Sequence, residues 1–414
     1  MGAGPAGLMA AERLSAQGVV VHVFDAKPSV GRKFLMAGKG GMNLTHSEPF
    51  APFVARYADS AAVLEPMLKA FGSEHVCEWA QGLGIDTFIG SSGRIFPKDM
   101  KAAPLLRAWL ARLRAQGVVF HMRHRWMGWT SDEVCRFQTA GGDVHIRPQA
   151  LLLALGGGSW ARLGSDGAWL PWLAERSIAV APLQSSNCGF EVAGLAQKDG
   201  AMQTGWTPFF QERYAGHAFK SVAIHFADSV GNVFDRQGEF VATQTGVEGS
   251  LVYAVSRLLR EEINRTGKAV MHLDLLPALS AERVYAEVAR PRGSRSLSTH
   301  LKTRLGLDGV KAAVLREVLS KEVMENPLEL AQALKALPIT LLATRPMDEA
   351  ISTAGGVRWC AVDEGLMSKT VPGVFFAGEM LDWEAPTGGY LLTACMSTGV
   401  RAAQSIVQYL QRLA

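Results

Sequence analysis

The sequence predicts an α/β fold in which glycine-rich turns at the ends of parallel strands face an extended ligand. Three observations indicate this fold. The chain opens on Gly2-Ala-Gly-Pro-Ala-Gly7, which reads G-x-G-x-x-G. A helical stretch (Leu8–Gln17) and a β-branched run ending at Asp25 follow it. Far along the chain, the apolar strand Val374–Ala377 leads into Gly378-Glu379. Strands that alternate with helices and glycine turns are typical of α/β sheets, which bind ligands at the carboxyl ends of their strands.

The opening turn predicts a dinucleotide site. Gly2 and Gly4 allow a tight turn and the close approach of a pyrophosphate, while Gly7 lets the helix pack near the sheet. The start of that helix offers free backbone N–H groups to phosphates. Pro5, which itself has no N–H, and Ala6 stand at this start, and we expect both to contact the cofactor. Asp25 follows Gly7 by 18 residues, close to the roughly 20-residue spacing of the acid that holds a ribose. We therefore expect Asp25 and Ala26 to contact the adenosine ribose.

One element of this unit is missing from the sequence as written. A Rossmann unit has a strand before its glycines, and here only Met1 precedes them. Either the start codon was placed too late or the strand was lost. That strand is normally central, so its absence removes a row of ladder hydrogen bonds and several buried side chains. We expect this chain to be poorly stable, and an upstream extension to raise its melting temperature.

The composition limits the classes of protein to which the chain can belong. The 414 residues are 48% hydrophobic and 19% charged with a net charge of +4, which is ordinary for a globular protein of two or three domains. Because the cations are scattered, we expect no nucleic-acid partner. The five cysteines form no C-x-x-C pair and the ten histidines no ligand pattern, so we expect no disulfide framework and no metal. Without an apolar run long enough to span a bilayer or a signal peptide, the sequence predicts a cytoplasmic protein. The oligomeric state stays open.

The segment Gly31–Asn43 is a glycine-rich loop with several cations, directly after the second strand. That position places it over the dinucleotide, and we expect Lys33, Gly40 and Asn43 to contact the cofactor. Lys39, Asn43 and Arg94 are weak candidates for orienting substrate or cofactor, and each could equally be a structural loop contact. No catalytic residue is assigned.

Two further glycine clusters predict FAD as the cofactor. The strand Leu151–Leu155 runs into Gly156-Gly-Gly158, where Ala154, Gly156 and Gly157 can approach a ligand. Near the C-terminus, Gly378-Glu379 is followed by Thr387-Gly-Gly-Tyr390 at the start of a helix, Leu391–Leu410. The acid suits ribityl hydroxyls, and the positive helix end suits the pyrimidine side of a reduced flavin. We expect this helix start to contact the flavin through Gly388, Gly389, Tyr390, Leu391 and Leu392.

Shifts in pattern divide the chain into four segments. Residues 1–187 form the first part of the FAD-binding domain and 341–414 its second part. Between them, 188–275 read as a β-rich insertion with short strands, and 276–340 as a helical cap.

The motifs together resemble a known family. Gly2–Gly7, Gly31-Arg-Lys33, Gly93-Arg-Ile-Phe-Pro97 and Ala377-Gly-Glu-Met-Leu-Asp382 are similar to the bacterial FAD-dependent flavoproteins of the aminoacetone-oxidase and bile-acid-reductase-like type. The resemblance also rests on Asn43, Ala154–Ser159, Thr353-Ala-Gly-Gly-Val357, Ser368-Lys369 and Pro386-Thr-Gly-Gly-Tyr390. It implies a glutathione-reductase-like FAD domain split by an insertion that caps the flavin.

The chain departs from this family at two places. The family usually has Arg-Cys before the loop asparagine, where this chain has Gly41-Met42, and its cation lies earlier, at Lys39. The family's Thr-His-x-Gly corresponds to Thr243-Gln244-Thr245-Gly246. The substrates of relatives are therefore not assumed for this chain.

Three functions follow from these residues. The first is an FAD-dependent oxidoreductase of a small organic substrate, reduced by NADPH or NADH. Because no second strand–G-x-G-x-x-G–helix unit exists, that donor would visit the flavin only transiently. The second is an oxygen-using FAD amine oxidase of the aminoacetone-oxidase type. The third, ranked last because no basic groove is evident, is a flavin-dependent protein that modifies RNA or senses the flavin.

Overall fold

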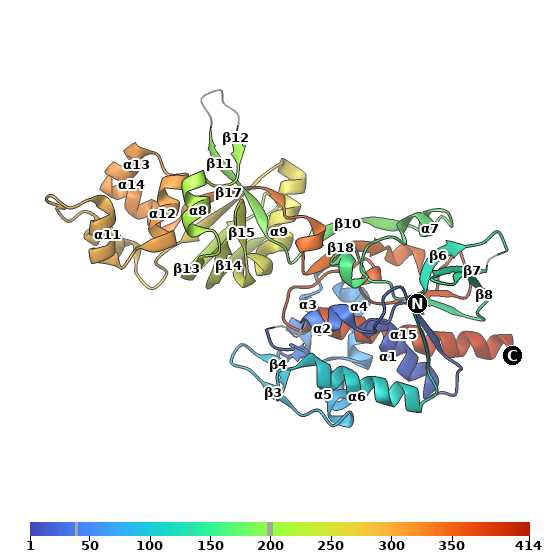
Figure 1. Ribbon diagram of the computed structural model, residues 1–414. Helices are drawn as coiled ribbons and strands as arrows, with labels where there is room; N and C mark the ends of the chain where they lie inside the picture. The colour runs from blue at the N-terminus through green and yellow to red at the C-terminus, as the bar shows by residue number, and fades with distance from the viewer. Residues whose placement is uncertain (38–39, 133, 197–201) are drawn as a thin grey trace. The chain divides into compact units, whose positions relative to one another are not determined.

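The computed structural model describes residues 1–37, 40–132, 134–196 and 202–414. The chain forms two compact units (Figure 1). Unit 1 combines Met1–Ser185 with Ile351–Ala414, so that both ends of the chain belong to it, and unit 2 is the continuous segment Ser186–Ala350.

Unit 1 contains a mixed set of helices and short strands. Its helices are α1 (Pro5–Ser15), α2 (Arg32–Ala37), α3 (Phe50–Ala55), α4 (Ala61–Ala70), α5 (Ser73–Gly82), α6 (Ala102–Ala115), α7 (Leu170–Ala174) and α15 (Tyr390–Leu413), with the 3-10 turns η1 (Ala58–Ser60), η2 (Ala161–Leu163), η4 (Trp359–Ala361) and η5 (Gly378–Met380). Its strands are β1 (His22–Asp25), β2 (Thr45–His46), β3 (Thr87–Ile89), β4 (Arg94–Pro97), β5 (Val119–Met122), β6 (Arg125–Trp129), β7 (Cys135–Thr139), β8 (Gly142–Ile146), β9 (Leu151–Leu153), β10 (Val180–Ser186), β18 (Ser352–Val357) and β19 (Val374–Phe376).

Parallel pairs of strands form the centre of unit 1. β1 pairs with β5, and β9 pairs with β19, so a strand near the C-terminus completes a sheet begun near the N-terminus. Helix α1 packs against α15 beside these strands, as Figure 1 shows in blue and red. β6, β7 and β8 form an antiparallel meander. Parallel strands with helices at both ends of the chain confirm the predicted α/β, Rossmann-like architecture.

The helix boundaries differ from the sequence prediction for simple reasons. α1 begins at Pro5, three residues before the predicted start, because proline at the first helical position has the right φ and lacks an N–H that would go unpaired. α15 runs from Tyr390 to Leu413, longer than the predicted Leu391–Leu410, and its last residues are exposed, so no burial pattern in the sequence marks where it ends.

A gap one strand wide separates β1 from β9. The backbone N–H of Gly2 donates to Phe24 of β1 at 2.8 Å, while Met1 accepts from the N–H of Ala154 at 2.8 Å and its amino group donates to Leu152 of β9 at 2.6 Å. Met1 and Gly2 therefore bridge the two pairs at one end only. Next to Met1, between β1 and β9, lies a cavity of about 730 Å³. It is lined by residues of these two strands and by apolar residues of α1 and α15. Burial lowers the pKa of the Met1 amino group to about 6.

Unit 2 is built on antiparallel strands. Its strands are β11 (Phe190–Ala196), β12 (Met202–Thr204), β13 (Ala218–Ala227), β14 (Val233–Ala242), β15 (Gly246–Glu248), β16 (Ala269–Asp274) and β17 (Leu337–Thr344). They pair in the order β12-β11-β15-β14-β13-β16-β17, and β17 also pairs with β11, which closes a ring of pairings. The boundary predicted at residue 340 falls inside β17, whose partners β11 and β16 both belong to this unit.

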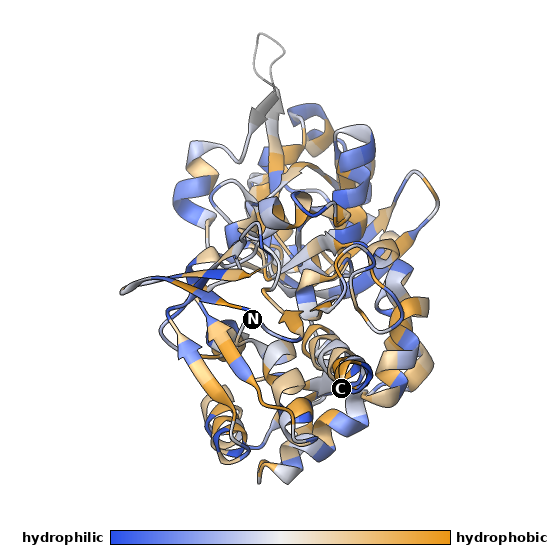
Figure 2. Ribbon diagram, turned by 90° about the vertical axis from the view of Figure 1, so that its right-hand side faces the viewer, coloured by the Kyte–Doolittle hydropathy of each residue, from blue (hydrophilic) through white to orange (hydrophobic). Residues whose placement is uncertain are grey.

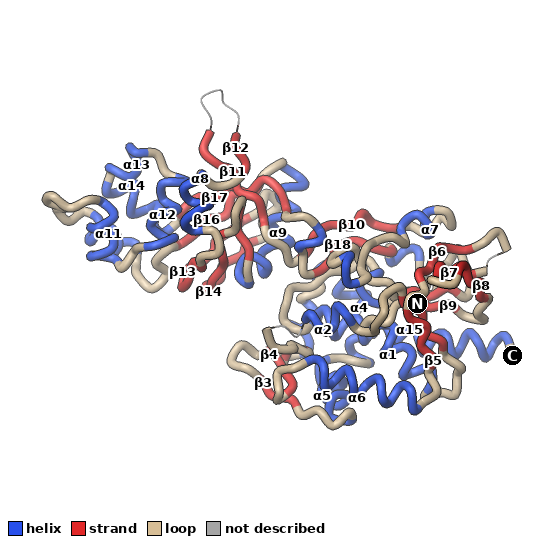
Figure 3. Tube along the Cα trace, viewed as in Figure 1, coloured by secondary structure: helices blue, strands red, loops and turns tan. Residues whose placement is uncertain are grey.

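Helices cover the sheet of unit 2. They are α8 (Pro208–Tyr214), α9 (Ser250–Thr266), α10 (Ala281–Val288), α11 (Leu297–Leu305), α12 (Gly309–Val318), α13 (Lys321–Glu325) and α14 (Pro327–Lys335), with the 3-10 turn η3 (Met347–Glu349). Figure 3 shows α9 on one side of the strands and α12 and α14 on the other, and these helices contact the sheet. In Figure 2 the helices carry both orange and blue residues. Apolar residues of α9, α10, α12 and α14 are buried in the core of this unit. This unit is the predicted insertion, with β-rich and helical parts.

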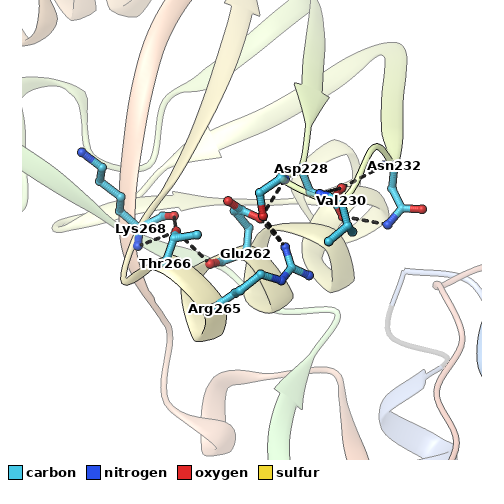
Figure 4. Close-up of polar contacts among 8 residues, drawn as sticks. Asp228, Val230, Asn232, Glu262, Arg265, Thr266 and Lys268 are labelled. Atoms are coloured by element: carbon cyan, nitrogen blue, oxygen red, sulfur yellow. Dashed lines mark hydrogen bonds and ion pairs between the residues drawn. The ribbon is translucent and has the colours of Figure 1, made fainter.

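Polar contacts close the β13–β14 hairpin of unit 2 and tie it to α9 (Figure 4). The carboxylate of Asp228 accepts from the backbone N–H of Asn232 at 2.8 Å and from its side-chain amide at 2.7 Å. On α9, Arg265 pairs with Glu262 at 2.6 Å. These groups satisfy one another, which favours a structural role. Across the described ranges, no helix combines the length and the apolar character needed to cross a membrane.

We predict that filling the gap stabilises the protein. An extension of about five β-branched apolar residues before Met1 would pair with β1 and β9 and fill the cavity. For a unit of this size each ~1 kcal/mol gained raises the melting temperature by about 2–4 °C, so calorimetry should show a rise of several degrees. An equally long extension of glycine, serine and aspartate is the control. Equal melting temperatures for the two extensions would contradict the prediction.

Candidate functional site

A groove of unit 1 brings the two ends of the chain together. The N-terminal glycine turn and Gly378-Glu379 line the same groove, at the carboxyl ends of β1, β9 and β19. Several residues predicted to bind the cofactor line it: Gly2, Gly4, Pro5, Ala6, Asp25, Ala26, Lys33, Ala154, Gly156, Gly378 and Glu379. The others are placed elsewhere in unit 1: Gly7, Gly40, Asn43, Gly157, Gly388, Gly389, Tyr390, Leu391 and Leu392.

The three glycines of the N-terminal turn serve different purposes. A Cβ on Gly2, whose φ is +91°, would lie 2.1 Å from the carbonyl oxygen of Ala154, and one on Gly7 would lie 2.0 Å from that of Gly2. Both positions are therefore required by backbone packing. A Cβ on Gly4 would meet no protein atom within 4 Å, although Gly4 lines the groove. The open space at Gly4 would allow a ligand to approach the backbone closely.

The start of α1 offers hydrogen-bond donors to the groove. Gly4 is the N-cap residue and provides no side-chain cap, so the first N–H groups of the helix lack side-chain partners. The positive end of the helix dipole adds to their attraction for anions. The open space at Gly4 and the uncapped helix together fit a pyrophosphate.

Asp25 is held in place at the end of β1. One carboxylate oxygen accepts from the N–H of Ala3 and the other from the N–H of Lys27, each at 2.8 Å. Each oxygen keeps a lone pair for a further donor. The carboxylate can therefore accept hydrogen bonds from a diol in the groove, as the predicted ribose contact requires.

Glu379 joins the C-terminal segment to the loop after β1. Its Oε2 pairs with Lys33 Nζ at 2.5 Å, and its Oε1 accepts from the N–H of Thr353 at 2.9 Å. Lys33 also donates to Ser159 Oγ at 2.8 Å. The side chains of Lys33 and Glu379 are 29% and 12% exposed, and both residues line the groove.

The loop after β9 contains one glycine that faces the groove and one that does not. Gly156 lines the groove with φ +74°. A Cβ on Gly157 would lie 2.4 Å from the side chain of Thr353, which accepts from the N–H groups of Gly158 and Ser159. Gly157 is therefore explained by packing alone.

The start of α15 is fixed by a network of side chains. Tyr390 donates to Glu48 at 2.5 Å, and Arg56 binds the same carboxylate through two hydrogen bonds of 3.1 and 2.8 Å. Burial alone would raise the pKa of Glu48, but the hydrogen bonds from Arg56 and Tyr390 outweigh it and the pKa is lowered. Burial, followed by the hydrogen bond to Glu48, raises the pKa of Tyr390. The buried hydroxyl therefore stays protonated and bound to an ionised carboxylate.

The glycines before Tyr390 are required by this arrangement. Gly389 has φ +94°, and its Cβ would lie 2.4 Å from the backbone of Thr45. Gly388 has φ +137°, and its Cβ would lie 2.8 Å from the ring of Tyr390. Gly389 caps α15 without a side-chain hydrogen bond, so the N–H groups of Tyr390, Leu391 and Leu392 stand at an uncapped helix end.

The structure gives the weak catalytic candidates limited support. Asn43 uses its side-chain amide to donate to the carbonyls of Thr45 and Ile95, at 2.9 and 3.2 Å, which is a loop-bracing role. Arg94 lies in β4, opposite His46 of β2. Lys39 lies outside the described residues. Gly40 is exposed in a turn.

Sequence reasoning missed several residues of the groove. Trp126 of β6, Ser165 and Trp169 line it, as do Arg125 and Asp166, which pair at 2.8 Å. They come from the meander and from the loop before α7, and neither segment carries a recognisable motif. Only their positions, directly after β5 and after the Gly156 loop, could have indicated them.

Comparisons with known proteins agree with this architecture. The family model described as the HI0933-like protein Rossmann domain matches residues 1–405. The 3-dehydro-bile acid delta(4,6)-reductase of Clostridium scindens is 24% identical over 447 residues, covering 99% of this chain and 98% of the relative. The ribosomal RNA dihydrouridine synthase of Haemophilus influenzae is 24% identical over 415 residues, covering 98% of this chain and 97% of the relative.

Among solved structures, the 3-ketosteroid-delta4-(5alpha)-dehydrogenase from Rhodococcus jostii RHA1 is similar with a TM-score of 0.49 and 14% identity, over 98% of this chain and 95% of that one. Because the family model spans nearly the whole sequence, the chain belongs to the HI0933-like Rossmann-domain family and is an FAD-dependent oxidoreductase.

Proposed function

We propose that this enzyme uses NADPH or NADH to reduce a carbon–carbon double bond, conjugated with a carbonyl group, in a small organic substrate. The observation that carries the proposal is the groove shared by the N-terminal glycine turn and Gly378-Glu379. When bound there, FAD supplies the ability to accept and donate a hydride.

The residues of the groove have distinct roles in this proposal. Asp25 accepts from the adenosine ribose, and the uncapped start of α1 at Gly4 receives the pyrophosphate. Glu379 accepts from ribityl hydroxyls, with Lys33 balancing its charge. The uncapped start of α15 supports the flavin's pyrimidine end, where its dipole favours the electron-rich reduced state. Asn43 and Arg94 shape the loops beside it.

The names of two relatives support a reductase. One is called a delta(4,6)-reductase of 3-dehydro-bile acids and the other a dihydrouridine synthase of ribosomal RNA. Both names describe the saturation of a ring double bond. We infer that the common step is hydride addition to a polarised double bond, for which FAD, once reduced by a donor, can supply the hydride.

The architecture favours a donor that visits the flavin and leaves. A dedicated nicotinamide domain needs parallel strands with a glycine turn before a helix. In the described residues of unit 2, the strand pairings are antiparallel. Gly157 and Gly389 are explained by packing against Thr353 and Thr45. The groove is therefore the dinucleotide site that we assign, and NAD(P)H reaches the flavin transiently.

RNA is the second candidate substrate. The relative from Haemophilus influenzae is named for a modification of ribosomal RNA, and residues 288–307 contain five cations and no acid. Arg292 and Arg295 are exposed in this segment of unit 2. A uracil ring presents the same kind of polarised double bond. RNA that copurifies with the protein and dissociates steeply with salt would favour this candidate, whereas purification free of RNA favours the small substrate.

We predict that Asp25→Ala weakens FAD binding about 10- to 150-fold, because a hydrogen bond to a charged group contributes about 1.5–3 kcal/mol. Calorimetric titration with FAD measures the change. Asp143→Ala, which removes an exposed carboxylate of β8, is the matched control and should bind FAD like the parent. If both variants bind FAD equally, the assignment of Asp25 is wrong.

We predict that NADPH or NADH bleaches the visible absorbance of the FAD-loaded protein under anaerobic conditions. A cyclic enone added afterwards should restore the colour, because it reoxidises the flavin. Stopped-flow absorbance measures both steps. A flavin that stays oxidised with both nicotinamides but bleaches with aminoacetone would contradict the proposal and indicate the amine oxidase instead.

A further inference from the structure

One tryptophan of unit 1 has a backbone conformation that bulky residues rarely adopt. Trp160 follows the Gly156–Ser159 loop with φ +64° and ψ +53°, in the left-handed region. A large side chain is strained there, and such strain is typical of active sites and ligand-binding sites. Trp160 is half-buried and belongs to none of the hydrophobic cores formed by the described residues. Core packing therefore does not explain the strain.

The indole of Trp160 instead supports an arginine. The guanidinium carbon of Arg162 lies 5.0 Å from the centroid of the indole ring, which is a cation–π contact. Arg162 is exposed, and within the part of the chain that the structure describes its side chain has no hydrogen bond or ion pair. The contact therefore holds a positive charge at the surface and leaves the N–H donors of the guanidinium available to an anion.

This pair lies in a loop whose two flanks border the groove. Gly156 before it and Gly164 after it both line the groove. The residue next to the tryptophan is fixed, because Ser159 Oγ accepts from Lys33 at 2.8 Å. A second cation lies against the same loop, since a Cβ on Gly164 would lie 3.2 Å from Cγ of Lys27. The amino group of Lys27 also has no acid partner in the described ranges, so the loop is positively charged.

The charge of this loop suits a phosphate group. Arginine binds phosphate through several N–H donors at once, and an arginine beside a dinucleotide site can accommodate the 2′-phosphate of an adenosine. We propose that Arg162, held on the ring of Trp160, binds the 2′-phosphate of NADPH and makes the enzyme select NADPH over NADH. NADH has a hydroxyl group in place of this phosphate. The inference rests on the proposed function, in which a nicotinamide donor visits the flavin transiently.

The test uses the FAD-loaded protein, so that FAD already occupies its own site when the second dinucleotide is added. Calorimetric titration with NADP⁺ and, separately, with NAD⁺ measures binding without electron transfer. We expect the parent to bind NADP⁺ more tightly than NAD⁺. Arg162→Gln should weaken NADP⁺ binding about 10-fold and leave NAD⁺ binding unchanged. In stopped-flow reduction of the flavin, the same variant should lose its preference for NADPH.

Two further variants test the role of the tryptophan. Trp160→Gly should weaken NADP⁺ binding about 2- to 5-fold, because the guanidinium loses its support. It should melt no lower than the parent, because glycine adopts left-handed backbone without strain. Arg176→Gln is the matched control and should bind NADP⁺ like the parent. Arg176 lies 5.5 Å from the ring of Trp129, in an arginine–tryptophan pair of the same unit that does not line the groove.

The outcomes separate this inference from the proposed function. If the parent binds both dinucleotides equally, or if Arg162→Gln binds NADP⁺ like the parent, the inference is overturned and the flavoenzyme remains. An equal loss in Arg176→Gln also overturns it, because the effect would then not belong to this loop. If Trp160→Gly fails to fold, Arg162→Gln decides the test, because it leaves the strained backbone unchanged. If NADP⁺ binds selectively but neither NADPH nor NADH bleaches the flavin, the phosphate site stands and the proposed function fails.

Discussion

The structure depends on the close approach of the first turn to two later segments. Gly2 sits so near Ala154 that a side chain there would overlap the carbonyl oxygen. On the other side, Ala6 contacts two glycines of the C-terminal segment, because a Cβ on Gly378 would lie 2.8 Å from the methyl group of Ala6 and one on Gly399 would lie 2.5 Å from its carbonyl oxygen. The start of α1 is therefore enclosed by glycines from both ends of the chain, and the groove exists only when these ends meet.

Close backbone contacts also fix the start of α15, where we predict the flavin to bind. Gly389 lies against Thr45, and Tyr390 binds Glu48. Thr45 and Glu48 thus fix the start of α15. In the same way Ala154, directly after β9, fixes the turn before α1. Two uncapped helix ends are held by rigid contacts rather than by capping side chains, which keeps their N–H groups available to a ligand. Helix ends without caps are costly unless something else pairs with them, and we propose that an extended cofactor pairs with both.

Much of this could be predicted from the sequence because glycine patterns report backbone geometry directly. The turn at Gly2–Gly7 and the acid at Asp25 were identified by spacing, and Val374–Phe376 by its apolar run before Gly378. Glycines alone could not tell packing from ligand contact: Gly4 faces open space, whereas Gly157 is filled by Thr353. Trp126 and Ser165 were not predicted as groove residues, because they reach the groove only through the tertiary fold and no local sequence pattern indicates this position. The closing of unit 2 by β17 was missed for the same reason, since its partner β11 is far away in sequence.

The central claim is that both ends of the polypeptide hold one cofactor. Hydrogen–deuterium exchange with and without FAD tests it directly, because amide exchange slows where a ligand orders the backbone. The account predicts that FAD slows exchange together at Gly2–Leu8, at Gly156–Ser159 and at Gly378–Leu392, with the same dependence on FAD concentration. Slower exchange at one end of the chain alone, with the other end unaffected at saturating FAD, would contradict it.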